Sequence, residues 1–343
     1  MEKTRKRRGT GRVTLQEVAN FAGVGTMTVS RALRTPEQVS DKLREKIEQA
    51  VEELGYIPNR TAGALASGHS HTVAVLVPSL TDKASSRFMQ SLQQVLNKNE
   101  FQLLLGCHEY NQLKEAEILM TLLQGNPAAL VIFGSQLADK THQILEKTNI
   151  PTINVVGSPF SPAQITIETA FFEASYKLTE HLLEQGYKNI GFIGAHMDNR
   201  LQRQQLNGWH KAMLSHYQNS DLVITMPDAP SLQLGRYSLN EILLRQPELD
   251  AVICSHEEIA LGIMFECQRR LLKIPENIAV ACLDGSDNCD QTHPTLTSIR
   301  IDYKKMGIET GKLLIGLLNN NHDESEESRI VQFNYQIELR QST

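Results

Sequence analysis

The spacing of apolar residues along the chain changes its period once, near residue 70. Between Leu43 and Leu54 the apolar side chains recur every three or four positions, which predicts an amphipathic helix. From His71 onward, short uninterrupted apolar runs alternate with helical patterns, and the first run is Thr72–Pro78. Because such runs are typical of buried parallel strands, the two parts of the chain are expected to fold in different ways.

Residues 13–58 are expected to form three helices. Thr14 and Glu17 have the spacing of a capping box, in which two otherwise unpaired backbone N–H groups at a helix start are satisfied. Gly23 ends this first helix and supplies a tight turn. A second helix is expected over Thr26–Leu33.

The order of these elements suggests a helix-turn-helix. The second helix should bury Val29 and Leu33, and Pro36 prevents its continuation. Ser40 is expected to cap the third helix and Gly55 to end it. In DNA-binding proteins of this geometry the second helix lies in the major groove. A plain three-helix scaffold with a polar face is the alternative.

The exposed face of the second helix carries side chains suited to reading DNA. Arg31 presents two donors to a guanine edge, and Met27 can pack against a thymine methyl group. Thr26 can bond a base or a phosphate, while Thr28 and Ser30 are small donors suited to phosphates.

The remainder of the chain predicts an α/β body. About 270 residues in two sets of strands indicate two doubly wound parallel-sheet lobes, with the default ligand site in the cleft beyond the carboxyl ends of the strands. The further expected strands are Gln102–Gly106, Ala129–Phe133, Thr152–Val156, Asn189–Gly194, Leu222–Met226, Ala251–Cys254 and Ile278–Leu283, with helices such as Phe172–Gln185, Leu201–Ser215 and Ile259–Leu272 between them.

Charge divides at the same place as the periodicity. The 343 residues carry a formal net charge of −5. Residues 1–68 hold 12 Lys/Arg against 8 Asp/Glu, a net of +4, and the remainder holds 22 against 31, a net of −9. A basic head on an acidic body suggests an anionic partner for the head alone, although a solubilising tail would give the same charge.

Several classes of protein are disfavoured by composition and motifs. Hydrophobic residues make up 41% and charged residues 21%, and no apolar run is long enough to span a bilayer. The basic start has no apolar run behind it, so no secretory signal is expected. The five cysteines form no C-x-x-C pair, which favours reduced thiols over disulfides or a metal site. His256-Glu257 lacks the second histidine of H-E-x-x-H, because residue 260 is alanine. With no catalytic cluster and no nucleotide-binding glycine motif, we expect no enzyme, cofactor or metal.

Three segments of the head carry a specific resemblance. They are Val13–Ala19, Ala22–Arg31 and Leu54–Arg60, and together they resemble the start of lac repressor (LacI/GalR) family regulators. The likeness continues through the whole chain. Within that family, Gly25–Ser40 and Asn59–Ser67 look most like the repressors of gluconate utilisation genes.

The resemblance gives a role to residues 59–70. A helix of about two turns that contains Gly63 would be marginal alone, so we expect it to fold when docked on DNA. In the family, paired hinge helices enter the minor groove and a leucine opens a base step; Leu65, beside Ala62, takes that position here. Without the resemblance a plain linker would be preferred. The expected DNA-binding residues are Thr14, Thr26, Met27, Thr28, Ser30, Arg31, Asn59, Arg60, Ala62 and Leu65.

By the same resemblance, the body is a periplasmic-binding-protein-like core that senses a ligand and forms the dimer. The expected organisation is a basic arm (1–12), a helix-turn-helix domain (13–58), a hinge (59–70) and the body (71–343), with lobe one about 71–170 and 301–329 and lobe two about 171–300 and 330–343.

The family also implies residues that contact the effector. Arg203 would clamp a carboxylate or hydroxyl groups, and Asp284 would face the ligand. Taken alone, Arg203 reads as a solvated helix residue and Asp284 as part of an Asp-Gly turn. Other expected cleft residues are Asp82, Phe88, His256 and Tyr303.

The chain departs from the family at three places. His256-Glu257 stands where Asn-Asp is usual, Ala170-Phe171 where Asp-Asn is frequent, and Gly157 where an Asp often ends the strand. These departures weaken the transfer of any particular ligand, although an acidic one remains compatible with Arg203.

The sequence therefore predicts a cytoplasmic, homodimeric transcriptional repressor. It would bind a pseudopalindromic operator and respond to a small effector, gluconate or a related sugar acid, with no role at a membrane. A regulator of another carbohydrate or metabolite is the alternative within the family. A solute-binding protein, and an enzyme with a nucleic-acid-binding appendage, are the alternatives from other classes.

Overall fold

The computed structural model describes residues 13–58, 70–134, 137–157, 163, 165–195, 200–319 and 329–343. Contacts divide the chain into two compact units, Met1–Ser70 and His71–Thr343, which we call the head and the body. The basic arm lies outside the described residues. So do the hinge positions Asn59, Arg60, Ala62 and Leu65, whose roles stay predictions.

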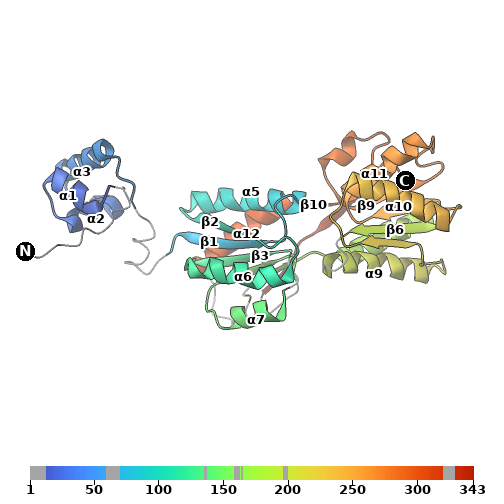
Figure 1. The fold of residues 1–343 in the computed structure, drawn as a ribbon, viewed down its shortest axis with the longest axis horizontal. Helices are drawn as coiled ribbons and strands as arrows, with labels where there is room; N and C mark the ends of the chain where they lie inside the picture. The colour runs from blue at the N-terminus through green and yellow to red at the C-terminus, as the bar shows by residue number, and fades with distance from the viewer. Residues whose placement is uncertain are drawn as a thin grey trace, which may run out of the picture. The chain divides into compact units, whose positions relative to one another are not determined.

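The head contains the expected helices. They are α1 (Leu15–Ala22), α2 (Thr26–Arg34) and α3 (Asp41–Leu54), with a 3-10 turn, η1 (Pro36–Gln38), between the last two (Figure 1). The capping box of Thr14 is confirmed, since both of its reciprocal hydrogen bonds with Glu17 are present.

The head helices follow the expected chemistry except at one helix end and at one buried position. Gly23 and Gly55 end α1 and α3 in the left-handed region, at φ 62° and 63°. Ser40 occupies the position before α3, but its side chain makes no capping bond. In α2, Val29 and Ala32 are buried while Leu33 is only partly so, because Ala32 turns toward α1 and α3.

The first lobe of the body is a parallel sheet covered on both faces. Its strand order is β11-β5-β4-β3-β1-β2. Helices α5 (Lys83–Lys98) and α12 (Tyr303–Leu318) pack on one face, and α6 (Gln112–Gln124) and α7 (Asp139–Glu146) on the other. The strands are β1 (Thr72–Val77), β2 (Gln102–Cys107), β3 (Ala129–Phe133), β4 (Thr152–Val155), β5 (Ile165–Glu168) and β11 (Arg329–Gln332).

The second lobe repeats this arrangement, with strand order β12-β10-β9-β8-β6-β7. Helices α8 (Phe171–Glu184) and α9 (Arg200–Ser215) cover one face, and α10 (Leu232–Arg245) and α11 (Glu257–Arg269) the other. β12 runs antiparallel to β10, and all other pairings are parallel. The strands are β6 (Ile190–Ala195), β7 (Val223–Met226), β8 (Ala251–Cys254), β9 (Ala279–Gly285), β10 (Thr297–Ile301) and β12 (Tyr335–Glu338), with a 3-10 turn, η2 (Asp287–Gln291), after β9.

The fold class is confirmed, and the eight expected strands are present to within two residues at each end. The sequence reading missed β5, β10, β11 and β12. These strands have four or five residues and mix apolar with polar side chains, so none forms the uninterrupted apolar run that marked the others.

In the described residues the chain passes between the lobes three times: after β5, at Asp302, and between β11 and β12. The last passage lies later than expected, because Arg329–Gln332 pair with Ile165–Glu168 in the first sheet. Residues 330–332 therefore belong to lobe one, not to lobe two.

In each lobe, a glycine allows two helices on one face of the sheet to approach closely, and Gly235 and Gly262 do the same for α10 and α11. A Cβ at Gly307 of α12 would lie 2.4 Å from the Phe88 carbonyl oxygen of α5. A Cβ at Gly208 of α9 would lie 2.3 Å from the Phe172 carbonyl oxygen of α8. Because the obstacles are backbone atoms, any larger residue would force the helices apart.

Candidate DNA-reading helix and ligand cavity

The outer face of α2 presents the side chains expected to read bases. Met27 is 76% exposed, and Arg31 is also exposed. Ser30 accepts a hydrogen bond of 2.9 Å from Arg34 Nη2. The helix holds Arg31 and Arg34 and no acidic residue, so its surface is locally positive.

The start of α2 is open to an anion. Its N-cap residue, Gly25, makes no side-chain capping bond, and no acidic residue lies in the first turn. The first backbone N–H groups of a helix attract phosphate when no side chain caps them. Thr26 and Thr28, both partly exposed, lie in this first turn.

Thr14 has a structural task. Its hydroxyl donates to Glu17 Oε2 at 3.0 Å and accepts from the Glu17 backbone N–H at 3.3 Å. A phosphate contact from this residue would have to share the capping hydroxyl.

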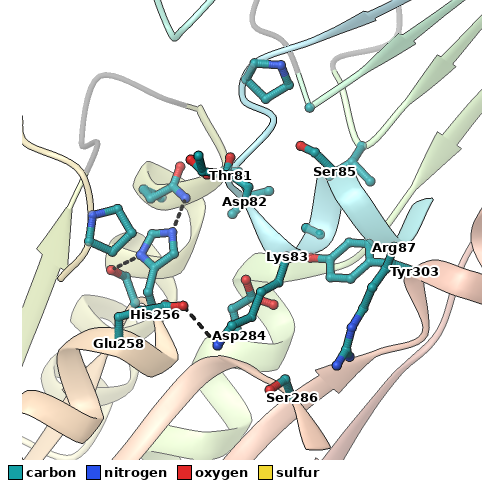
Figure 2. A pocket seen from close by; sticks show the side chains of 18 of the residues that line it. Thr81, Asp82, Lys83, Ser85, Arg87, His256, Glu258, Asp284, Ser286 and Tyr303 are labelled. Atoms are coloured by element: carbon teal, nitrogen blue, oxygen red, sulfur yellow. Dashed lines mark hydrogen bonds and ion pairs between the residues drawn. The ribbon is translucent and has the colours of Figure 1, made fainter. Parts of the chain in front are cut away.

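In the body, a cavity of about 300 Å³ lies between the carboxyl ends of the two sheets (Figure 2). Four of the six expected effector residues line it: Asp82, His256, Asp284 and Tyr303. The volume suits a small polar ligand. The lining also includes Thr81, Lys83, Ser85, Arg87, Tyr110, Phe133, Phe171, Leu201, Gln202, Gln205, Ser255, Glu258 and Ser286.

The other two expected residues do not line the cavity. Phe88 is fully buried and stacks on Phe133, whose ring is 4.5 Å away, so it supports a lining side chain. Arg203 is exposed on α9, whereas Gln202 and Gln205 of the same helix line the cavity. Because successive helix residues are about 100° apart, Arg203 projects away from the face that these two glutamines share.

Ion pairs join the two lobes beside the cavity. Lys83 of α5 lies with its Nζ atom 2.6 Å from Glu257 Oε1 and 3.0 Å from Glu258 Oε1, both on α11. Arg87, one turn further along α5, lies 3.4 Å from Asp287 of η2. Burial lowers the pKa of Lys83. Its hydrogen bonds to the two glutamates and their charges raise the pKa by more, so the net shift is upward.

Glu257 accounts for one departure from the family pattern. Its side chain is 1% exposed and accepts from the Ser286 backbone N–H at 2.7 Å and from Asn288 Nδ2 at 2.9 Å. Burial acts to raise its pKa, but Lys83 and these two donors outweigh burial, so the pKa is lowered. Glu257 therefore remains a carboxylate that joins the lobes and fixes the loop after β9.

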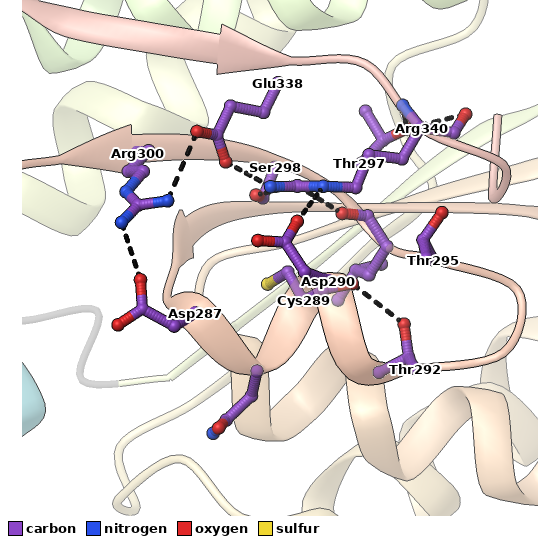
Figure 3. A network of polar contacts seen from close by, with 12 residues as sticks. Asp287, Cys289, Asp290, Thr292, Thr295, Thr297, Ser298, Arg300, Glu338 and Arg340 are labelled. Carbon is purple, nitrogen blue, oxygen red and sulfur yellow. Dashed lines mark hydrogen bonds and ion pairs between the residues drawn. The ribbon is translucent and has the colours of Figure 1, made fainter.

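That loop is also held from the other side (Figure 3). Arg340 lies 2.6 Å from Asp290 and donates to the Leu296 carbonyl oxygen at 2.7 Å. Arg300 lies 2.6 Å from Asp287. Both ends of η2 are thus fixed to the second sheet, and the adjacent residues Asp284 and Ser286 are held at the cavity.

Asp284 lies among other acidic groups. Burial, together with the nearby charges of Glu258 and Glu257, raises its pKa to about 7. Burial, together with the charge of the nearby Asp284, raises the pKa of the Tyr303 hydroxyl, so this tyrosine stays protonated. On the opposite wall, the Tyr110 hydroxyl donates to Asp82.

Three buried polar atoms of the lining have no hydrogen-bond partner among the described residues. They are Ser85 Oγ, Gln202 Oε1 and Gln205 Oε1, on side chains at most 5% exposed. A buried polar group without a partner costs about 1–3 kcal/mol. The cavity therefore offers unfilled hydrogen-bonding positions, as expected of a site for a polyhydroxy ligand.

Of the two other departures, Phe171, in place of a polar residue, reaches the cavity, whereas Gly157 is not among the residues that line it. Gly157 lies against Asn154, so that a Cβ there would be 2.3 Å from Asn154 Oδ1. The preceding Val156 has φ 58°, which is rare for a β-branched residue. A carboxylate at 157 would not fit beside Asn154 without a shift.

The sequence did not predict six of the residues at the cavity: Lys83, Tyr110, Glu257, Glu258 and the two glutamines. Lys83 and Tyr110 follow the ends of strands β1 and β2, where cleft residues are expected. Glu257 was singled out only as a departure. Pairing across the cavity by residues 174 positions apart leaves no trace in local patterns.

Two further features are absent from the described residues. No helix there is long and apolar enough to cross a membrane. No group of three or more His, Cys, Asp or Glu side chains there is placed to hold a metal ion.

Comparison with known proteins agrees with both units. Residues 14–59 match the family of bacterial regulatory proteins, lacI family, and residues 179–343 match a periplasmic binding protein-like domain. The HTH-type transcriptional regulator GntR of Escherichia coli (strain K12) is 34% identical over 86% of this chain and 89% of its own length.

Solved structures give the same result. A PurR family transcriptional regulator from Vibrio parahaemolyticus is 40% identical, with a TM-score of 0.73 over 79% of this chain and 98% of its own. The lac repressor dimer bound to operator and an anti-inducer has a TM-score of 0.83 at 24% identity, over 96% of this chain and 99% of its own.

The helix-turn-helix head and the two-lobed body with its cavity define a DNA-binding transcriptional regulator. The chain belongs to the lacI family of bacterial regulatory proteins.

Proposed function

We propose that this regulator is a homodimeric, cytoplasmic repressor that binds a pseudopalindromic operator. A small sugar acid in the cavity between the lobes controls its affinity for that operator. Gluconate is the first candidate, because the GntR regulators are among its relatives. The observation that carries the ligand part is the cavity itself, with the unpartnered Ser85, Gln202 and Gln205 atoms in its wall.

The same proposal assigns roles within the head. Arg31 reads a guanine and Met27 contacts a thymine methyl, while Thr26, Thr28 and Ser30 bind phosphates. The exposure of Met27 and Arg31 on a helix without acidic residues supports this division. No catalytic role is proposed, since the relatives are transcriptional regulators.

Replacing Arg31 by alanine tests the reading of bases. An operator is first selected from random DNA with the wild-type chain. Arg31→Ala should then lower discrimination between operator and scrambled DNA by about 1–3 kcal/mol, measured by fluorescence anisotropy at fixed salt. Arg34→Ala removes the same charge from the same helix, and its smaller effect should fall equally on both DNAs. An equal loss on both DNAs from Arg31→Ala would exclude base reading.

Ligand control is tested on the same complex. At 100 times its Kd, a ligand that binds only the folded chain adds about 2.7 kcal/mol of stability, which a thermal shift detects. Gluconate should raise the Tm and release operator DNA. A Tm shift without release would leave gluconate as a ligand but not as the inducer.

A further inference from the structure

The cavity contains more negative than positive charge before any ligand enters. Among its described residues, Asp82, Glu258 and Asp284 line it, and Glu257 adjoins it. The lining cations are Lys83 and Arg87, and each is paired with a carboxylate of the second lobe. A sugar acid would add one more negative charge to this group.

Asp82 and Asp284 are the two lining carboxylates outside these ion pairs. Asp82 accepts a hydrogen bond from Tyr110, whereas Asp284 takes no part in the ion pairs or side-chain hydrogen bonds among the described residues. Lys83 lies near enough to act on Asp284, but the net effect of burial and of the surrounding acids still disfavours its charged form. The titratable and charged groups that face Asp284 are Asp82 and Lys83 at the start of α5, Tyr110 after β2, Glu257 and Glu258 on α11, and Tyr303 on α12.

This arrangement has a consequence for the ligand named under the proposed function, on which the inference rests. We propose that a ligand carboxylate enters the cavity together with one proton from solvent, which Asp284 holds as a neutral carboxylic acid that donates a hydrogen bond to the ligand. A carboxylic acid kept neutral in an apolar or acidic setting serves as a donor in this way. No additional cation is then required.

The direction of the pH dependence follows. Without ligand, Asp284 titrates at a pKa of about 7. A bound carboxylate beside it disfavours its charged form further, so the pKa rises in the complex. Below pH 7 the proton is already present, and binding takes up little. Above pH 7 binding takes up nearly one proton, and each pH unit weakens the affinity up to tenfold.

The test uses the full chain and two probes that differ at one carbon. Sodium gluconate carries the carboxylate, and sorbitol has a CH₂OH group in its place. Titration calorimetry at pH 6, 7 and 8, in buffers of different ionisation enthalpy, gives the number of protons taken up. We expect nearly one proton per gluconate at pH 8, and a Kd that rises several-fold to tenfold between pH 7 and 8. Sorbitol, which brings no charge, should show neither effect.

Variants assign the proton to a residue. Asp284→Asn should abolish the uptake and flatten the pH profile of the Kd for gluconate, because an amide donates without titrating. Asp139→Asn, which changes an exposed residue at the start of α7, should behave as wild type.

The outcomes separate this inference from the proposed function. Gluconate binding without proton uptake, or uptake that persists in Asp284→Asn, overturns the inference and leaves ligand control in place. In the second case His256, which lines the same cavity, becomes the proton carrier. Binding of sorbitol but not gluconate at pH 6 overturns the inference and the choice of a sugar acid. If neither probe binds at any pH, both proposals fail.

Discussion

In the first lobe, the cavity edge carries the cations Lys83 and Arg87 on one helix, α5, with Asp82 just before that helix. In the second lobe, the corresponding edge carries Glu258 and Asp284 in the lining, with Glu257 behind them, and no Lys or Arg among the described lining residues. The two lobes nevertheless share one strand order and one way of covering their sheets. The repeated architecture thus fixes where side chains meet, and the difference in charge between the two edges decides what they can hold.

The strongest test of this contrast is the buried glutamate that joins the lobes. Glu257→Leu removes the acceptor of the Ser286 backbone N–H and a partner of Lys83. We expect a loss of about 3 kcal/mol in the free energy of unfolding, measured by urea denaturation. Glu258→Gln is the matched control, because this neighbour is 33% exposed and should cost less than about 1 kcal/mol. Equal losses from the two variants would show that the burial of Glu257 does not determine how much it contributes to stability.

The pH dependence of stability should also distinguish the wild-type chain from Glu257→Leu. Because the pKa of Glu257 is lowered, its contribution is present at neutral pH. In an unfolded chain this pKa has the ordinary value of 4.5, and in the folded chain it is lower. The contribution is therefore lost as the pH falls below 4.5 and then through the lowered pKa of the folded state. Wild type should therefore lose more stability than Glu257→Leu between pH 5 and 3.

The shared architecture is tested by two of the close helix contacts. Gly307→Ala in the first lobe and Gly208→Ala in the second each place a Cβ against a backbone carbonyl. Overpacking of this kind costs about 1–3 kcal/mol. We expect similar losses for the two variants, near 2 kcal/mol, from urea midpoints. A loss confined to one lobe would contradict the equivalence of the two helix pairs.

The smallest effect should come from the second ion pair between the lobes. Arg87 lies 3.4 Å from Asp287, both groups are partly exposed, and Asp287 keeps Arg300 at 2.6 Å. Arg87→Met should change the free energy of unfolding by less than about 1 kcal/mol. A loss as large as that of Glu257→Leu would mean that Arg87 stabilises the fold through more than its pairing with Asp287.

Much of the fold follows from local patterns. Gly23, Gly55 and the capping box of Thr14 each act within one turn of chain, and the long apolar runs form the central strands as expected. β11 and β12 did not emerge, because polar side chains interrupt their short apolar runs.

The site was accessible from sequence only in part. Asp82 and Asp284 follow strand ends, where ligand-facing residues are expected in α/β sheets. Arg203 was assigned by position in the family, but the face it takes depends on where α9 begins, which one sequence does not fix. The pairing of Lys83 with Glu257 arises from packing one lobe against the other, so it required the structure.

The strands β11 and β12 complete two different sheets although only two residues separate them. During synthesis, neither sheet can acquire its last strand, at one of its two edges, until residues 329–338 have left the ribosome. Helix α12, which covers the first sheet, also emerges after nearly all of the second lobe. The first lobe must therefore wait, partly uncovered, while the second is made, which makes this stretch of translation the period when a chaperone would be of most use.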